Sequence, residues 1–174
     1  MNYQPFCVET PSAGTIRGLR WGSADGLPVL AVHGWLDNAA SFLPIAPYLT
    51  GLNLVAIDLP GHGFSQHRPA GARYHLMDYP PAVLEVADAL DWKELVLLGH
   101  SLGGAISTTV AVAAPMRIRA MLLIENLGPV SQAADGAPGR LRDSIAAYAK
   151  FRDKTPVLYP DLEPLIMARA RLGK

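Results

Sequence analysis

A glycine-rich pentapeptide, Gly99-His100-Ser101-Leu102-Gly103, has the spacing of a reactive serine held on a tight turn. The pattern G-x-S-x-G places a serine on a strained corner between a strand and a helix, where side chains at the two glycine positions would collide with neighbouring backbone. The Ser101 hydroxyl would then be held out into a cleft, and the backbone N–H of Leu102 would point to where an oxyanion forms. The sequence therefore predicts a nucleophile elbow, with a glycine-rich packing turn as the alternative.

The segments on both sides of the pentapeptide have the patterns that an elbow needs. Residues 94–98 form an apolar run typical of a buried strand, and residues 102–114 have a helical pattern. Short apolar runs alternate with helical patterns along the chain, which predicts an α/β fold: a mostly parallel, doubly wound sheet with helices on both faces. Loops that follow parallel strands meet at one edge of such a sheet, where ligands bind. The other expected elements are strands at residues 15–21, 27–33, 52–57 and 118–124, a short helical stripe over residues 38–49, and a helix capped by Asp78 with Pro80 and Pro81 in its first turn.

The pattern changes in the last quarter of the chain, where no strand is evident. Residues 134–139 predict a loop, residues 141–151 a helix, and Asp161 can cap a last helix. We therefore expect residues 1–129 to form the sheet-containing core. Residues 130–174 are expected to begin a helical cap that is truncated.

Three sequence blocks, LAVHGWLDN at residues 30–38, DLPGHGFS at 58–65 and GHSLGG at 99–104, together resemble the α/β-hydrolase fold family. The first block is particularly similar to the serine hydrolase-like branch, and the resemblance covers roughly residues 18–129. It implies a sheet of the α/β-hydrolase type that is incomplete at its C-terminal side. It also implies a second oxyanion amide, that of Trp35. No motif in the sequence indicates a cofactor. The reaction it implies is hydrolysis of an ester, or less often an amide or thioester, through a covalent acyl-serine. The expected substrate is a small or medium carboxylic ester.

Two further residues are candidates for the site. Glu125 follows the expected strand at residues 118–124, where some α/β-hydrolases carry the catalytic carboxylate, but it could equally hydrogen-bond loop amides, and both interpretations stay open. Phe42, with Trp35 and Leu102, indicates an apolar cleft floor and is predicted to bind substrate.

Other polar residues near these motifs are expected to serve the architecture. We interpret His33 as a buried, hydrogen-bonded residue that ends a strand, and Asp58 as a turn former. His100 precedes the candidate nucleophile and is expected to face away from the cleft.

The general base of such an enzyme has no candidate in the expected place. Enzymes of this family carry the catalytic histidine after the serine and the acid, whereas the five histidines here all precede Ser101: His33, His62, His67, His75 and His100. We therefore expect this chain to be the N-terminal part of a longer serine hydrolase and to be inactive alone, with the strand at residues 118–124 as an unprotected sheet edge. The alternative is a catalytically silent protein of the same fold that binds a ligand or a partner.

Composition excludes several other classes of function. The 15 basic and 15 acidic residues balance, which argues against a nucleic-acid binder or a polybasic membrane-surface protein. Residues 95–114 lack charged side chains, but their glycines divide a strand from a helix, so no membrane span is expected. The sequence lacks a phosphate-binding loop and a metal-spaced His or Cys cluster, so no metal or nucleotide is implied. A single cysteine, Cys7, and an N-terminus unlike a signal peptide predict a cytoplasmic location, and the oligomeric state stays open.

Overall fold

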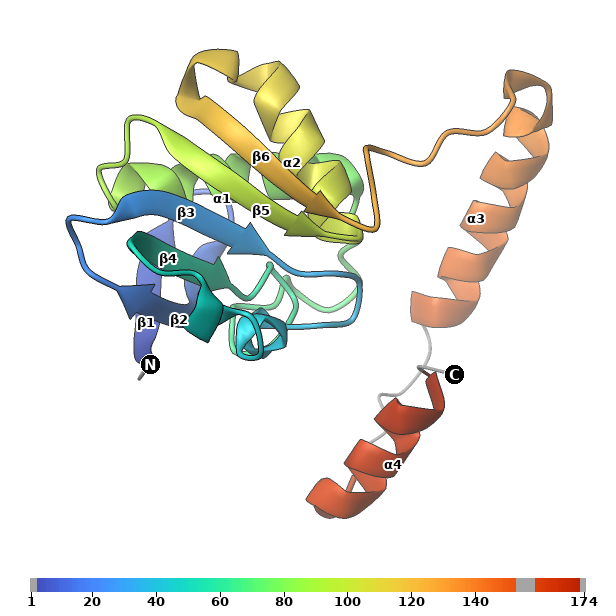
Figure 1. Ribbon diagram of the computed structural model, residues 1–174. Coiled ribbons are helices and arrows are strands. Elements are labelled where there is room, and N and C mark those ends of the chain that lie inside the picture. The colour runs from blue at the N-terminus through green and yellow to red at the C-terminus, as the bar shows by residue number, and fades with distance from the viewer. Residues whose placement is uncertain (1–2, 153–158, 173–174) are drawn as a thin grey trace. The chain divides into compact units, whose positions relative to one another are not determined.

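Six strands form a single sheet in the computed structural model, which describes residues 3–152 and 159–172 (Figure 1). Four of them are parallel neighbours, and β1 and β2 extend the sheet with antiparallel pairings. The order across the sheet is β1-β2-β4-β3-β5-β6. Their bounds are β1 Gln4–Thr10, β2 Gly14–Gly22, β3 Leu27–Val32, β4 Leu52–Ile57, β5 Leu95–His100 and β6 Ile118–Ile124. The predicted α/β class with a mostly parallel sheet is confirmed.

The central strands are apolar on both faces because both faces are covered. One face packs against α1 (Tyr79–Ala89) and α2 (Leu102–Ala113), which lie on the same side of the sheet in Figure 1. The other face packs against two short 3₁₀ helices, η1 (Ala39–Phe42) and η2 (Ala46–Tyr48). These two short helices replace the single helical stripe expected there, because Pro44 and Pro47 interrupt a longer helix.

The outer strand β6 is the sheet edge that the sequence predicts. It pairs with β5 on one side, and its middle residues are exposed: Met121 is 41% and Leu122 53% exposed. An edge with exposed apolar side chains can pair with another chain.

The chain divides into two compact units, residues 1–131 and residues 132–174. The second unit contains η5 (Ala134–Gly136), α3 (Ala137–Arg152) and α4 (Leu162–Leu172). Its described residues contain no strand, as expected. The loop expected at residues 134–139 is wrong: η5 and the first turn of α3 occupy it, because the glycines at 136 and 139 do not break the helical pattern there.

A strand that the sequence analysis did not predict, β1, pairs along its whole length with β2. The expected cap of α1 is wrong. Asp78 makes no side-chain cap to α1; its carboxylate instead accepts hydrogen bonds from the His75 amide and from Arg68, within the loop closed by η3 (Leu76–Asp78). The remaining short helix, η4 (Pro115–Arg117), leads into β6.

Candidate active site

Ser101 lies on a strained corner between β5 and α2. Its backbone has φ 50° and ψ −112°, a region that residues other than glycine rarely adopt and that costs about 1–3 kcal/mol. The corner is held by hydrogen bonds: the Ser101 N–H donates to the Ile124 carbonyl over 2.9 Å, and the Ser101 carbonyl accepts from Gly104 N–H, also over 2.9 Å. The Ser101 hydroxyl makes no capping hydrogen bond to α2, although serine is a preferred cap. A strained serine whose hydroxyl is not used as a cap fits the predicted elbow.

Close backbone contacts explain why glycines flank the serine. A Cβ at Gly99 would lie 2.6 Å from the Gly103 carbonyl oxygen, and a Cβ at Gly103 would lie 1.9 Å from the Val32 carbonyl oxygen. These are the backbone collisions that the spacing predicts. The elbow is therefore pressed against the end of β3.

The start of α2 supplies donors beside the serine. The hydrogen bond from Gly104 N–H to the Ser101 carbonyl closes the first turn of α2. The Leu102 N–H comes before it, among the first amides of a helix, which have no partner within the helix. Amides at a helix N-terminus carry a positive partial charge and stabilise a nearby negative oxygen. Leu102 is thus in the position where an oxyanion donor is expected.

The loop after β3 begins directly against the elbow. A Cβ at Gly34 would lie 3.4 Å from the Ser101 Cβ. Trp35 comes next; the residue is 58% exposed, and its ring meets the His62 ring edge-on, with 5.6 Å between the ring centroids. Leu36 then adopts a left-handed conformation with φ 55°. The loop that carries the Trp35 amide is therefore a neighbour of Ser101 and has a strained backbone.

His33 is fully buried and holds the beginning of this loop. Its Nδ1 lies 2.7 Å from the Gly34 carbonyl oxygen, and its Nε2 accepts a hydrogen bond from Leu59 N–H over 3.0 Å. These partners assign the neutral tautomer with the proton on Nδ1. Burial lowers the pKa of His33, which favours the same neutral form. The ring is a hydrogen-bonded structural group, as the sequence predicts.

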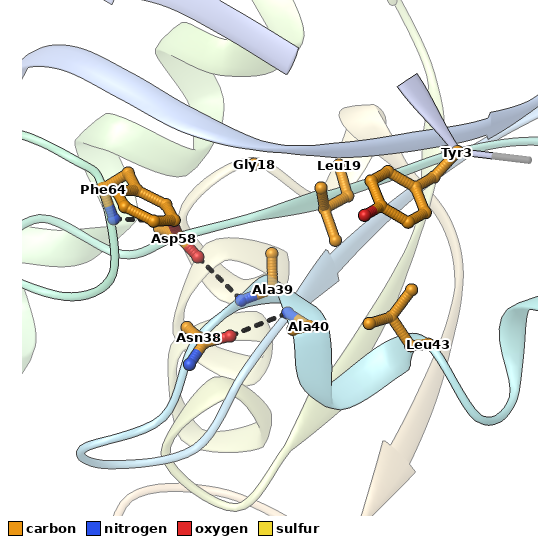
Figure 2. Close-up of a pocket in the computed structure, with 9 residues that line it drawn as sticks. All are labelled: Tyr3, Gly18, Leu19, Asn38, Ala39, Ala40, Leu43, Asp58 and Phe64. Carbon is orange, nitrogen blue, oxygen red and sulfur yellow. Dashed lines mark hydrogen bonds between the residues drawn. The ribbon is translucent and has the colours of Figure 1, made fainter. Parts of the chain in front are cut away.

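Asp58 does more than form a turn. Its carboxylate is buried and accepts hydrogen bonds from Ala39 N–H over 2.7 Å and from Phe64 N–H over 2.8 Å, so it joins the loops after β3 and β4 (Figure 2). The turn at Gly63 packs onto it so closely that a Cβ there would lie 2.3 Å from the carboxylate. The carboxylate therefore fastens two separate loops at the carboxyl edge of the sheet.

Glu125 follows β6 and lies on the other side of the elbow. Its backbone has φ 61°, and its side chain is 76% exposed. Its Oε2 lies 3.4 Å from His100 Nε2, a distance near the outer limit of a hydrogen bond. This carboxylate is close to the elbow but only loosely held.

His100 was expected to face away from the cleft, and the structure instead places it at a cavity beside the elbow. Side chains alternate along β5, so His100 points to the sheet face that η1 covers, opposite to Gly99. The cavity has a volume of about 250 Å³ and is lined by Asp37, Ser41, Phe42, Ile45, His100 and Ile124. Phe42, the predicted substrate-binding residue, is 3% exposed and otherwise packs in the core on that face.

Asn126 is a contributor that the motifs do not reveal. Its Nδ2 donates to the Ser101 carbonyl oxygen over 3.0 Å, and its Oδ1 accepts from Gly128 N–H over 2.9 Å. The side chain thereby ties the turn after β6 to the elbow. The only signal in the sequence is an Asn two residues before a Gly, a pattern typical of turns in general.

In the parts of the chain that the structure describes, no three His, Cys, Asp or Glu side chains lie close enough to hold a metal ion. The same residues include no helix of the length and apolarity that a membrane crossing needs.

Sequence comparison adds an independent line of support to this geometry. A profile of the alpha/beta hydrolase fold family matches residues 28–156, most of the chain. The chain belongs to the alpha/beta hydrolase fold family. A serine hydrolase-like protein of Danio rerio is 40% identical over 116 residues, which are 66% of this chain and 36% of that protein. A probable serine hydrolase of Drosophila melanogaster is 35% identical over 164 residues, 91% of this chain and 49% of that protein.

Two solved structures have a fold similar to that of this chain. The crystal structure of a hypothetical protein from Pseudomonas aeruginosa PAO1 is 43% identical, with a TM-score of 0.88 over 96% of this chain and 59% of that one. A thioesterase domain from the curacin biosynthetic pathway is 26% identical, with a TM-score of 0.73 over 99% of this chain and 61% of that one. The chain spans half or less of the two curated relatives above. The family match and these relatives support a hydrolase-type function, and they place the chain in the serine hydrolase-like branch of the family.

Proposed function

We propose that Ser101 is the nucleophile of a serine hydrolase that cleaves small carboxylic esters. The observation that carries this proposal is the strained backbone of Ser101, φ 50°, at the junction of β5 and α2. Strained backbone at residues other than glycine clusters at active sites and ligand-binding positions. The serine hydrolase-like names of the relatives support the same reaction class.

Each step of the proposed reaction has a candidate group. The Ser101 oxygen attacks the ester carbonyl carbon, and its proton passes to a base; the carbonyl becomes an oxyanion that the Leu102 and Trp35 amides stabilise. The alcohol then leaves with a proton from that base, and an acyl-serine remains. Water attacks the acyl-serine, releases the carboxylic acid and restores the hydroxyl. Glu125 is the candidate acid that would orient the base.

The base itself is proposed to be an imidazole from outside these 174 residues, since no histidine follows Ser101. Without a base the serine stays protonated and weakly nucleophilic, and loss of a triad base costs about 10⁶ in kcat in a well-studied serine protease. An oxyanion hole alone leaves about 10³–10⁴ over the reaction in water. We therefore expect no detectable ester turnover by this chain alone, but slow stoichiometric reaction of Ser101 with a reactive probe.

A fluorophosphonate probe, with and without added free imidazole, tests the proposal. We expect slow labelling at Ser101, faster labelling when imidazole is added, and no labelling of Ser101→Ala. Ser65→Ala is the matched control, because Ser65 is a buried loop serine whose hydroxyl donates to the Asp58 carbonyl oxygen. A labelling rate that is the same with and without imidazole, or labelling that persists in Ser101→Ala, would contradict the proposal. Either result would favour a catalytically inactive protein that binds a ligand.

A further inference from the structure

The Asp58 carboxylate accepts hydrogen bonds from backbone N–H groups on both loops, that of Ala39 after β3 and that of Phe64 after β4. It is 3% exposed, and each of its oxygens accepts one backbone N–H. Figure 2 shows it between Ala39 and Phe64, with one dashed line to each. A carboxylate is an acceptor on both oxygens, whereas an amide of the same shape presents one oxygen and one donor group. At this position the acid can accept both N–H groups, whereas an amide would turn a donor toward one of them.

The loop that carries the proposed Trp35 amide is tied at each end to adjacent residues. At its start, His33 spans from the Gly34 carbonyl to Leu59 N–H. At its end, Ala39 N–H bonds to Asp58, the residue before Leu59. Both ties therefore lead to the first two residues after β4.

Between these ties the loop has a conformation that it would not keep alone. Leu36 has φ 55°, which is unfavourable for a residue with a side chain. Such a residue persists only where the surrounding structure fixes it. Asn38 adds a local bond, from Ala40 N–H to its own Oδ1 over 2.9 Å, but this bond stays inside the loop and does not attach it to the sheet (Figure 2).

We propose that Asp58 is a positioning residue of the active site: its carboxylate fixes the loop that presents the Trp35 amide to the oxyanion. This inference rests on the proposed function, because the Trp35 amide matters only if an oxyanion forms at Ser101. Asp58 does not touch the reacting atoms; it acts through Ala39 and the loop.

The first test follows the loop itself and needs no reactivity. The chain contains three tryptophans, of which Trp21 and Trp92 are buried and Trp35 is exposed on the loop. We would incorporate 5-fluorotryptophan and record the fluorine NMR spectrum, assigning the Trp35 line with Trp35→Phe. Asp58→Asn is expected to shift or broaden the Trp35 line and to leave the other two unchanged. Ser65→Ala, which alters the same β4 loop without reaching Ala39, is expected to leave all three unchanged. An unmoved Trp35 line in Asp58→Asn would overturn the proposal.

The unmutated protein provides a second measurement in case Asp58→Asn does not fold. The amide protons of Ala39 and Phe64 are expected to resonate downfield and to exchange slowly with solvent, because both bond to a buried carboxylate. A rapidly exchanging Ala39 amide would mean that the link does not exist.

The second test asks whether the loop matters to Ser101. In Asp58→Asn we expect the maximal rate of imidazole-assisted fluorophosphonate labelling to fall about 10- to 100-fold, because displacing a group by 1 Å can cost that much. The probe concentration at half-maximal rate should change little, and Ser65→Ala should match the unmutated chain. A displaced Trp35 line with unchanged labelling would reject the oxyanion role of Trp35 and with it this positioning role. Absence of any Ser101 labelling in the unmutated chain would instead count against the proposed function, while the NMR result stands.

Discussion

The two sides of the elbow differ in how firmly their polar groups are held. On the β3 and β4 side, a buried imidazole and a buried carboxylate make backbone hydrogen bonds of 2.7–3.0 Å. On the β6 side, Glu125 is 76% exposed and lies 3.4 Å from its partner, His100. The loops after β3 and β4 are therefore fastened by buried groups, whereas the carboxylate after β6 is open to solvent. Under the proposed function, the first side would carry the oxyanion donor of Trp35 and the second would orient a base.

The largest effect is expected where the elbow meets β3. Gly103→Ala should lower the free energy of unfolding by more than about 3 kcal/mol, since the added Cβ would lie 1.9 Å from the Val32 carbonyl oxygen and backbone must move. Gly139→Ala is the matched control: it lies in α3 with nothing within 4 Å of an added Cβ, and it should not lower stability. Urea unfolding followed by circular dichroism measures both. If Gly103→Ala is as stable as the unmutated protein, the backbone around Val32 moves aside more easily than this contact indicates.

The second-largest loss of stability is expected when the hydrogen bond from Asn126 to the Ser101 carbonyl is removed. Asn126→Asp keeps the oxygen that accepts from Gly128 N–H but replaces the donor to the Ser101 carbonyl, so a loss of about 1–2 kcal/mol is expected. Asn38→Asp adds the same charge and keeps its acceptor role toward Ala40, so its cost should stay below about 0.5 kcal/mol. Equal effects of the two substitutions in urea unfolding would show that added charge, and not the lost donor, is responsible.

These contacts also explain how much could be read from the sequence. The elbow was predictable because a side chain at either glycine would collide with backbone, at Gly99 with the nearby Gly103 and at Gly103 with the end of β3. The parallel sheet followed from apolar runs of strand length, while β1 was missed because it is an edge strand with a largely exposed face. Asp58 and Asn126 act on residues 19 and 25 positions away, and no local pattern encodes such a bond. The position of His100 on the η1 face depends on β5 continuing to residue 100, whereas the apolar pattern predicted that this strand ends at residue 98.

Lowering the pH should reduce the stability of the β3 and β4 side of the elbow, because His33 then takes up a proton in the unfolded chain. Burial lowers the pKa of His33 below its ordinary 6.5, so the unfolded chain binds a proton more readily than the folded one. The contribution of the neutral ring to stability is therefore complete above pH 6.5 and is lost as the pH falls below that value. His62 is shifted in the same direction by burial and adds to the effect. Thermal unfolding between pH 8 and pH 5 should give a falling Tm, and His33→Gln should give a flatter profile; parallel profiles would assign the dependence to other groups.

The smallest change in stability is expected on the open side. Glu125→Gln removes a charge that is 76% exposed and 3.4 Å from His100, and exposed pairs of this kind contribute about 0–1 kcal/mol, so we expect a change within about 0.5 kcal/mol in urea unfolding. Imidazole-assisted labelling of Ser101 should nevertheless slow, because a carboxylate beside the base stabilises the imidazolium that forms when the serine loses its proton. Glu125→Asp, which keeps the charge on a shorter side chain, should retain part of the rate. If labelling is unchanged in Glu125→Gln while stability falls by more than about 1 kcal/mol, the carboxylate is a structural group of the β6 turn. The two sides of the elbow would then both be architectural, and the acid would have to be sought elsewhere.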